Sequence, residues 1–132
     1  MTMEHKPIEK DDFETLQMLG VNLLVAFGSR VEGTANDQSD YDVGVVFEKT
    51  RVPAPRRYGM LYAFLQEHYP QACIDLVELD QAPYPMQFRA AMKGIALFES
   101  SRVSFADFRE RATRSYFDFK PILNIHEEAL RV

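Results

Sequence analysis

Four short apolar runs, each of strand length, constrain what this chain can fold into. They cover residues 21–27, 41–47, 73–79 and 95–98. Around and between them, apolar residues recur at helical spacing, and Gly20, Pro70 and Gly94 punctuate the pattern. The expected order is helix, strand, strand, helix, strand, helix, strand, helix, which predicts a layered α/β or α+β domain. The directions of the strands do not follow from this pattern.

The length of 132 residues predicts one domain over residues 1–132. The first twelve residues are polar, so we expect them to be loosely ordered. Hydrophobic residues make up 46% of the chain, which is enough for a packed core. The formal net charge of −5 argues against a basic face that grips phosphates. We therefore expect no direct binding of nucleic acid.

The single cysteine, Cys73, excludes an internal disulfide and any zinc site built from several cysteines. It lies in an apolar run, where we expect a small core residue. The three histidines His5, His68 and His126 lack the spacing of metal ligands. No apolar run is long enough to span a bilayer, and no secretory signal is visible. The expected location is the cytoplasm, without membrane association.

The residues that carry chemistry are expected around the first two apolar runs. Gly28 and Ser29 follow the first run, and Asp40-Tyr41-Asp42 begins the second. Glycine lets the backbone approach an anion closely, and backbone N–H groups with a hydroxyl suit a phosphate. Alternation along a strand places Asp40 and Asp42 on one face and Tyr41 on the other. Paired carboxylates repel each other unless protonated or bridged, and such oxygen ligands favour Mg²⁺ or Mn²⁺.

A third carboxylate, Asp75, interrupts the apolar stretch of residues 74–77. Burial of an acid within a strand is costly, so its place invites a partner. If this strand neighbours the strand of residues 41–47, Asp75 completes a cluster with Asp40 and Asp42. Such a cluster can hold two divalent cations that clamp an in-line phosphoryl or nucleotidyl transfer.

Each feature alone is ordinary turn chemistry. The joint pattern of Gly-Ser, ten residues and Asp-x-Asp, with a strand on either side, is rare by chance and favours a functional site. Arg30 follows the Gly-Ser pair, and two interpretations stay open for it. It contacts a triphosphate, or it is an exposed arginine after a turn.

The pattern resembles the signature of the minimal nucleotidyltransferases (MNT), a family within the DNA polymerase β-like superfamily. Here it comprises Gly28-Ser29, ten residues, then Asp40-Tyr41-Asp42, and Asp75 matches the family's later lone aspartate. Residues 111–121 are similar to the tail of MNT antitoxins that are paired with HEPN toxins. The resemblance extends from residue 21 to the C-terminus.

This resemblance implies a nucleotidyltransferase fold, with a small mixed sheet and helices on one face. It implies that Asp40, Asp42 and Asp75 bind two Mg²⁺ ions and that Asp75 helps to deprotonate the attacking hydroxyl. Gly28 and Ser29 would hold the β- and γ-phosphates of ATP. The implied function is an antitoxin that transfers AMP to a tyrosine of a HEPN ribonuclease.

Two other functions stay open at this stage. The chain is a non-catalytic antitoxin that masks its toxin by direct binding, or it transfers a nucleotide to a small hydroxylated molecule. The second of these is disfavoured because 132 residues leave little room for a further domain that would bind the acceptor.

Overall fold

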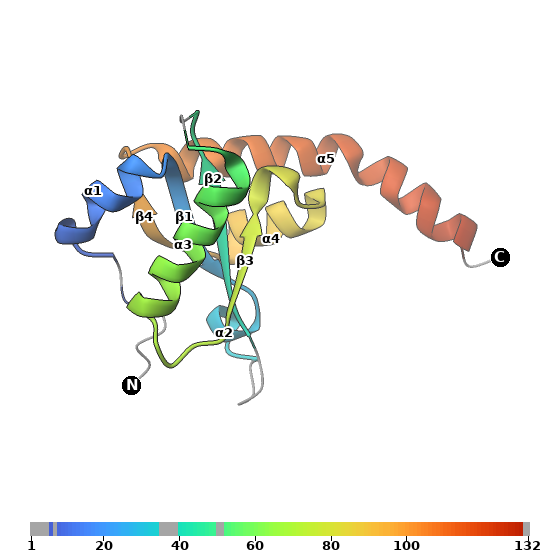
Figure 1. Cartoon of the computed structure of the whole chain (residues 1–132). Coiled ribbons are helices and arrows are strands. Elements are labelled where there is room, and N and C mark those ends of the chain that lie inside the picture. The colour runs from blue at the N-terminus through green and yellow to red at the C-terminus, as the bar shows by residue number, and fades with distance from the viewer. Residues whose placement is uncertain (1–5, 7, 35–39, 50–51, 131–132) are drawn as a thin grey trace.

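The structure is a computed structural model that describes residue 6 and residues 8–34, 40–49 and 52–130, with side chains up to residue 119. Its elements are α1 (Lys10–Met18), β1 (Val21–Phe27), α2 (Ser29–Glu32), β2 (Tyr41–Phe47), α3 (Ala54–His68), β3 (Ile74–Glu78), the short 3₁₀ helix η1 (Leu79–Gln81), α4 (Tyr84–Lys93), β4 (Ile95–Glu99) and α5 (Ser104–Leu130). Figure 1 shows these elements arranged around one sheet. The predicted alternation of strands and helices is confirmed.

The sheet has the strand order β3-β2-β1-β4. β1 runs antiparallel to both of its neighbours, β2 and β4, whereas β2 and β3 are parallel. The sheet is therefore mixed, as the resemblance implied. Its parallel pair is connected through α3, because parallel neighbours need a crossover to return the chain to the same edge.

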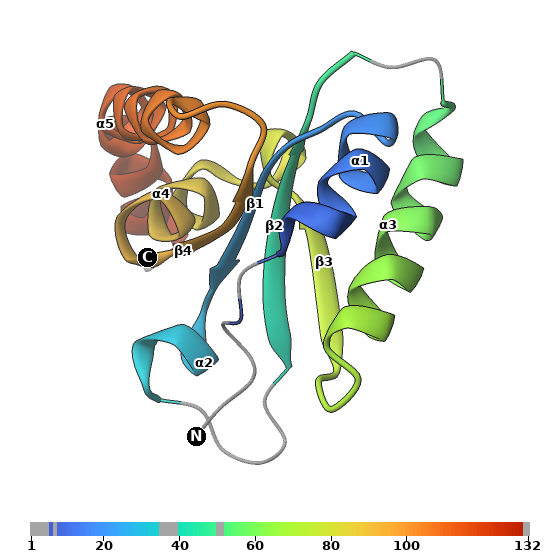
Figure 2. The ribbon, with the colours of Figure 1, turned by 90° about the vertical axis from the view of Figure 1, so that its left-hand side faces the viewer.

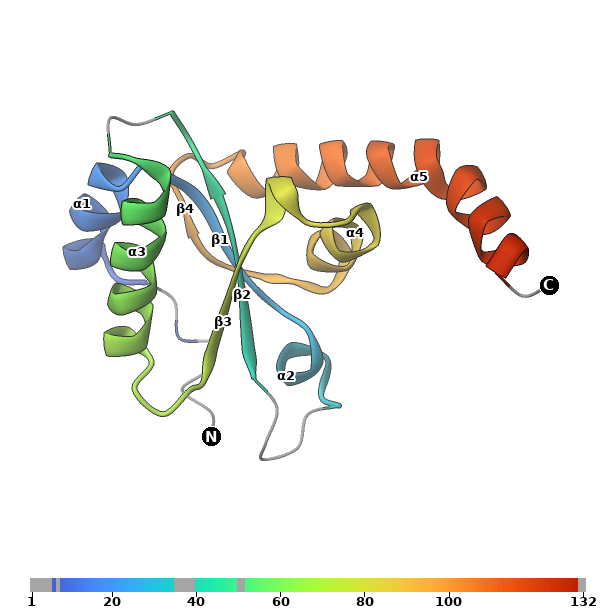
Figure 3. The same ribbon diagram turned by 45° about the vertical axis from the view of Figure 1, so that its right-hand side comes forward.

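Helices cover both faces of the sheet, so the expectation of helices on one face is wrong. α1 and α3 lie on one side, and α4 and α5 lie on the other (Figures 2 and 3). Leu24 and Ala26 of β1 pack in the core under α1 and α3, while Val25 and Phe27 pack against α4 and α5. A strand buried on both faces needs apolar residues at every position, which explains the uninterrupted run that defines β1.

The sequence pattern predicts helices over residues 57–69 and 86–93, and both begin earlier in the structure because prolines there start helices. Pro55 and Pro85 lie in the first turns of α3 and α4. The backbone N–H groups of a first turn have no partner within the helix, so a proline costs nothing there.

The prediction that Cys73 is a core residue is wrong. Cys73 precedes β3 and is exposed.

The described part of the N-terminal segment packs against the rest of the domain. Ile8 is buried, and its N–H donates to the carbonyl oxygen of Leu97 at 3.1 Å. The hydroxyl of Tyr69 donates to the carbonyl oxygen of Lys6, and α1 begins at Lys10. The expectation for residues 1–5 and 7 lies outside the described residues.

The sequence predicts one helix from residue 104 to about residue 119 and a separate helical stretch from Pro121. In the structure, the last helix, α5, is continuous over 27 residues. A proline inside a helix cannot donate the usual hydrogen bond and bends the axis. Figure 1 shows α5 projecting beyond the rest of the molecule and bending in its last part. Within the described part of the chain, no helix has the length and apolar character needed to cross a membrane.

Gly94 follows α4 as expected, but space explains it better than backbone conformation does. Its φ is −73°, which any residue adopts, whereas a Cβ there would lie 2.3 Å from both the carbonyl oxygen of Ala90 and Cγ1 of Val25. We expect Gly94→Ala to lower the free energy of unfolding by about 2 kcal/mol through this overpacking. Gly59→Ala is the matched control, because nothing lies within 4 Å of a Cβ there. Since Gly59 lies inside α3, alanine should stabilise by about 0.5–1 kcal/mol. Urea denaturation measures both changes, and equal effects would contradict this explanation.

Candidate active site

The Gly-Ser turn lies at the end of β1, directly beside the start of β2. Phe27 is paired with Asp42 in the antiparallel ladder, so the next residue, Gly28, lies over the Asp42 side chain. A Cβ on Gly28 would lie 2.2 Å from Oδ2 of Asp42, and its φ of +83° is also one that favours glycine. Ser29 then begins the single turn of α2. Glycine therefore lets a carboxylate rest against the turn that precedes it.

The parallel pairing of β2 and β3 brings Asp42 and Asp75 together. The two residues are direct partners in the ladder. Protonated Asp42 donates a hydrogen bond to Asp75, and the pKa of Asp42 is raised to about 6. Burial is the largest cause, followed by the negative charge and hydrogen bond of Asp75 and then by the charge of Asp40, while Arg89 acts in the opposite direction. A pair of carboxylates held in mutual repulsion is a typical cation site.

Burial within this pair differs from the sequence prediction. Asp75 is exposed and Asp42 is half-buried. The reason is the position of the strands, because β3 is at the edge of the sheet and β2 is inside it. The desolvation expected for Asp75 therefore falls on Asp42.

Asp40 lies one step further out. It is exposed, ahead of β2, and accepts a hydrogen bond from the Cys73 thiol; that bond and the charge of Asp40 raise the pKa of Cys73. Tyr41 points the other way, as predicted, and is fully buried against Tyr69. Among the described residues, no three His, Cys, Asp or Glu side chains are close enough to hold one metal ion. The structure thus brings Asp42 and Asp75 together, whereas Asp40 lies on the exposed surface ahead of β2.

A cavity of about 520 Å³ opens onto this pair. It is lined by Phe27, Gly28, Ser29, Asp42, Asp75, Val77, Pro83, Pro85, Met86 and Arg89. Backbone and hydroxyl donors, two carboxylates and one guanidinium therefore face the same space. This donor set fits a divalent cation together with an anionic phosphate group.

The cation that lines the cavity is Arg89 from α4, and the predicted Arg30 is not among the lining residues. Arg89 Nε donates to Oε2 of Glu32 at 2.7 Å. No sequence motif predicts a role for Arg89 in this cavity. Helical spacing does place it on one face with Pro85 and Met86, but only the fold shows that this face meets the strands.

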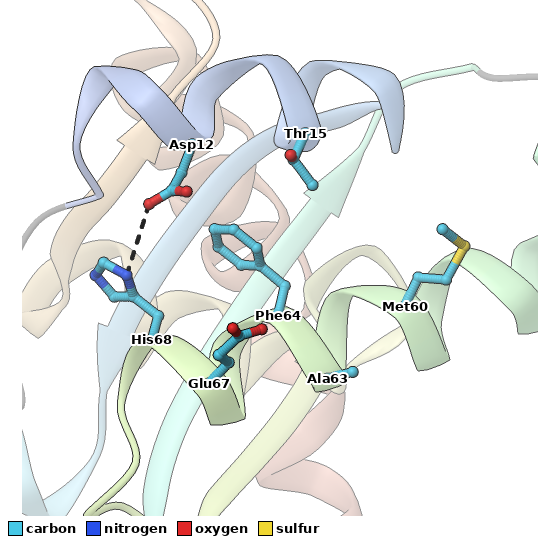
Figure 4. A pocket seen from close by; sticks show the side chains of 7 residues that line it. All are labelled: Asp12, Thr15, Met60, Ala63, Phe64, Glu67 and His68. Atoms are coloured by element: carbon cyan, nitrogen blue, oxygen red, sulfur yellow. Dashed lines mark ion pairs between the residues drawn. The ribbon is translucent and has the colours of Figure 1, made fainter.

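A second cavity, of about 620 Å³, is lined by residues of α1 and α3 (Figure 4). These two helices lie on the opposite face of the sheet from α4 (Figure 2). His68 and Asp12 line this second cavity, with Nδ1 of His68 3.9 Å from Oδ2 of Asp12. The His68 ring stacks on Phe64 and meets Tyr69 edge to face. Both cavities are open, so chemistry decides between them, and only the smaller one has the Gly-Ser turn and the paired aspartates.

A family model described as "Polymerase beta, Nucleotidyltransferase" matches residues 13–103. The chain belongs to this nucleotidyltransferase family. The match contains both Gly28-Ser29 and the three aspartates, so it confirms the family predicted from them. The match also includes every residue that lines the smaller cavity.

Solved structures share the nucleotidyltransferase fold at low sequence identity. A chain of a toxin–antitoxin complex with AMP-PNP has a TM-score of 0.69 and 17% identity, covering 92% of this chain and 99% of that one. A chain of the complex of tri-AMPylated Shewanella oneidensis HEPN toxin with MNT antitoxin has a TM-score of 0.64 and 15% identity, covering 92% of this chain and 97% of that one. A chain of the MntA-HepT toxin–antitoxin complex gives the same values of TM-score, identity and coverage. Among functionally curated proteins, none matches the sequence at a significant level.

Proposed function

We propose that this nucleotidyltransferase is an MNT antitoxin that transfers AMP from ATP to a tyrosine of a HEPN toxin. The observation that carries the proposal is the Asp42–Asp75 pair held against the Gly28-Ser29 turn in one cavity. Proteins with similar folds support the acceptor, because one solved complex contains an AMPylated HEPN toxin and another contains AMP-PNP. The proposed location of this ATP-dependent reaction is the cytoplasm.

The aspartates are the ligands proposed for two Mg²⁺ ions, with Mn²⁺ as a substitute. Asp42 and Asp75 already face each other, and a rotation of the exposed Asp40 side chain would add the third carboxylate. The bound cations would neutralise charge on the phosphates and on the leaving group. The raised pKa of Asp42 supports this fit: burial and then the charge of Asp75 disfavour its ionised form, and a bound cation would offset both.

The remaining steps belong to the protein's own side chains. Gly28 and Ser29 offer backbone N–H groups and a hydroxyl to the phosphates, and Asp75 accepts the proton of the attacking tyrosine hydroxyl. The tyrosine oxygen forms a bond to the α-phosphorus, the bond from that phosphorus to the bridging oxygen breaks, and pyrophosphate leaves. The transferred AMP adds negative charge and bulk to the toxin, which opposes the binding of RNA there.

Intact-mass analysis of the toxin tests this proposal directly. We expect incubation with this protein, ATP and Mg²⁺ to add one or more AMP units to the toxin. Asp75→Asn should remove the mass gain. Asp80→Asn is the matched control, because Asp80 pairs with Arg111 outside the cavity, and it should leave the gain intact.

Two other outcomes would overturn the proposal. An unmodified toxin in a stable complex with this protein would favour a binding antitoxin. Transfer to a small hydroxylated molecule in the absence of toxin would favour the other nucleotidyltransferase reaction.

A further inference from the structure

An ion pair beside the cavity connects α4 with α2, the short helix that begins at Ser29. Glu32 closes α2, three residues after Ser29, and its Oε2 accepts from Nε of Arg89 at 2.7 Å. The two residues are 57 positions apart in the chain. The pair therefore connects Arg89, which lines the cavity, with the helix that follows the Gly28-Ser29 turn.

The guanidinium of Arg89 is held where an anion is expected. Arg89 lines the cavity with Ser29 and Asp42, and its charge acts on the Asp42 carboxyl. In an otherwise acidic site, Arg89 is the one cation among the described lining residues. Its present partner, Glu32, is itself an anion and is not among those lining residues.

The ion pair is easily exchanged. The side chains of Arg89 and Glu32 are 53% and 25% exposed, so water competes for both groups and the pair contributes little to stability. A phosphate carries more negative charge than a carboxylate and accepts paired hydrogen bonds from a guanidinium. Glu32, once released, can be solvated at the end of α2.

We propose that Arg89 binds the phosphates of the incoming nucleoside triphosphate and that Glu32 holds Arg89 in place until the nucleotide displaces it. This inference rests on the proposed function. Because Glu32 and Ser29 share the turn of α2, Arg89 meets the same end of the triphosphate that Ser29 holds. Glu32 therefore acts as a competing internal anion that lowers nucleotide affinity and eases the release of pyrophosphate.

Calorimetric titration with a non-hydrolysable ATP analogue and Mg²⁺ tests the exchange without any acceptor protein. We expect Arg89→Ala to weaken binding by about tenfold or more, since a charge-assisted phosphate contact is lost. Glu32→Gln should tighten binding by about threefold to tenfold, because the competing anion is gone. AMP, which lacks the outer phosphates, should bind with similar affinity to all these proteins.

The double variant separates exchange from simple repulsion. If Glu32 acts through Arg89, Glu32→Gln has no effect in the Arg89→Ala protein, and the double variant binds like Arg89→Ala alone. Arg102→Ala is the matched control for loss of a positive charge. It follows β4, whose end pairs with the start of β1, far from Gly28. It should bind like the wild type.

The results distinguish failure of the ion-pair exchange from failure of the proposed function. Equal tightening by Glu32→Gln with and without Arg89, or unchanged binding in Arg89→Ala, overturns the exchange but leaves the proposed function standing. Failure of the wild type to bind the analogue overturns both. Thermal melting of each variant should match the wild type, because both side chains are surface groups.

Discussion

Asparagine in place of Asp42 is expected to abolish AMP transfer and, at the same time, to stabilise the metal-free protein. Transfer should fall by about a thousandfold or more, because a neutral amide neither balances the cations nor completes the carboxylate pair. Stability should rise because the ionised form of Asp42 is disfavoured by its partial burial and by the negative charge of Asp75. The proposed cation-binding role of Asp42 would therefore come at the expense of stability.

The pH dependence of the gain follows from the direction of the pKa shift. The pKa of Asp42 is raised from its ordinary 3.8 to about 6 in the folded protein. Below about pH 4 the carboxyl is protonated in both states, so it costs nothing. As the pH rises from about 4 to about 6, Asp42 of the folded state retains its proton while Asp42 of the unfolded state loses it. The folded wild type therefore loses stability relative to the variant. The loss is complete above about pH 6, and solvent screening limits it to about 1 kcal/mol.

Thermal denaturation in EDTA, from pH 4 to pH 8, measures this difference. The melting temperatures of wild type and Asp42→Asn should agree near pH 4, and at pH 7 the variant should melt about 4 °C higher. Asp40→Asn is the control for loss of a carboxylate, because Asp40 is exposed and its removal should change stability little. A variant that is less stable than wild type at pH 7 would contradict this account of Asp42.

The sequence predicted those elements whose residues are constrained on every side. β1 and β2 were predicted with their observed bounds, since both are buried and end at turn residues. The starts of α3 and α4 were missed because a proline ends one helix and begins another, and only the packing tells which. The second helical layer was also missed. The pattern reports that a helix has an apolar face, but it does not report which side of the sheet receives that face.

The residues of the candidate site also differ in how far the sequence could predict them. Gly28, Ser29, Asp40 and Asp42 could be proposed from the sequence because they lie close together in the chain and their chemistry is distinctive. The meeting of Asp42 with Asp75 depended on parallel pairing, which the sequence left open. Arg89 had no local signal, because its role depends on α4 packing beside a turn formed 57 residues earlier. The sequence pattern does not predict which distant segments of the chain come into contact.

Gly28→Ala is expected to inactivate the enzyme, and Gly33→Ala is its matched control. Both glycines have positive φ, +83° and +79°, so each alanine strains the backbone by about 1–3 kcal/mol. Their surroundings differ. A Cβ at Gly33 has nothing within 4 Å, whereas a Cβ at Gly28 would lie 2.2 Å from Oδ2 and 3.1 Å from Cγ of Asp42.

The collision should act on the site more than on the fold. Asp42 must turn away from Gly28, which separates it from Asp75 and from the Gly28-Ser29 turn. We expect binding of the ATP analogue and AMP transfer to fall by about a hundredfold or more in Gly28→Ala. Gly33→Ala should retain both to within about threefold, despite a similar loss of stability. Titration with Mg²⁺ and the analogue, alongside urea denaturation, separates the two effects. Similar binding by the two variants would mean that strain alone, and not the contact with Asp42, explains the glycine at position 28.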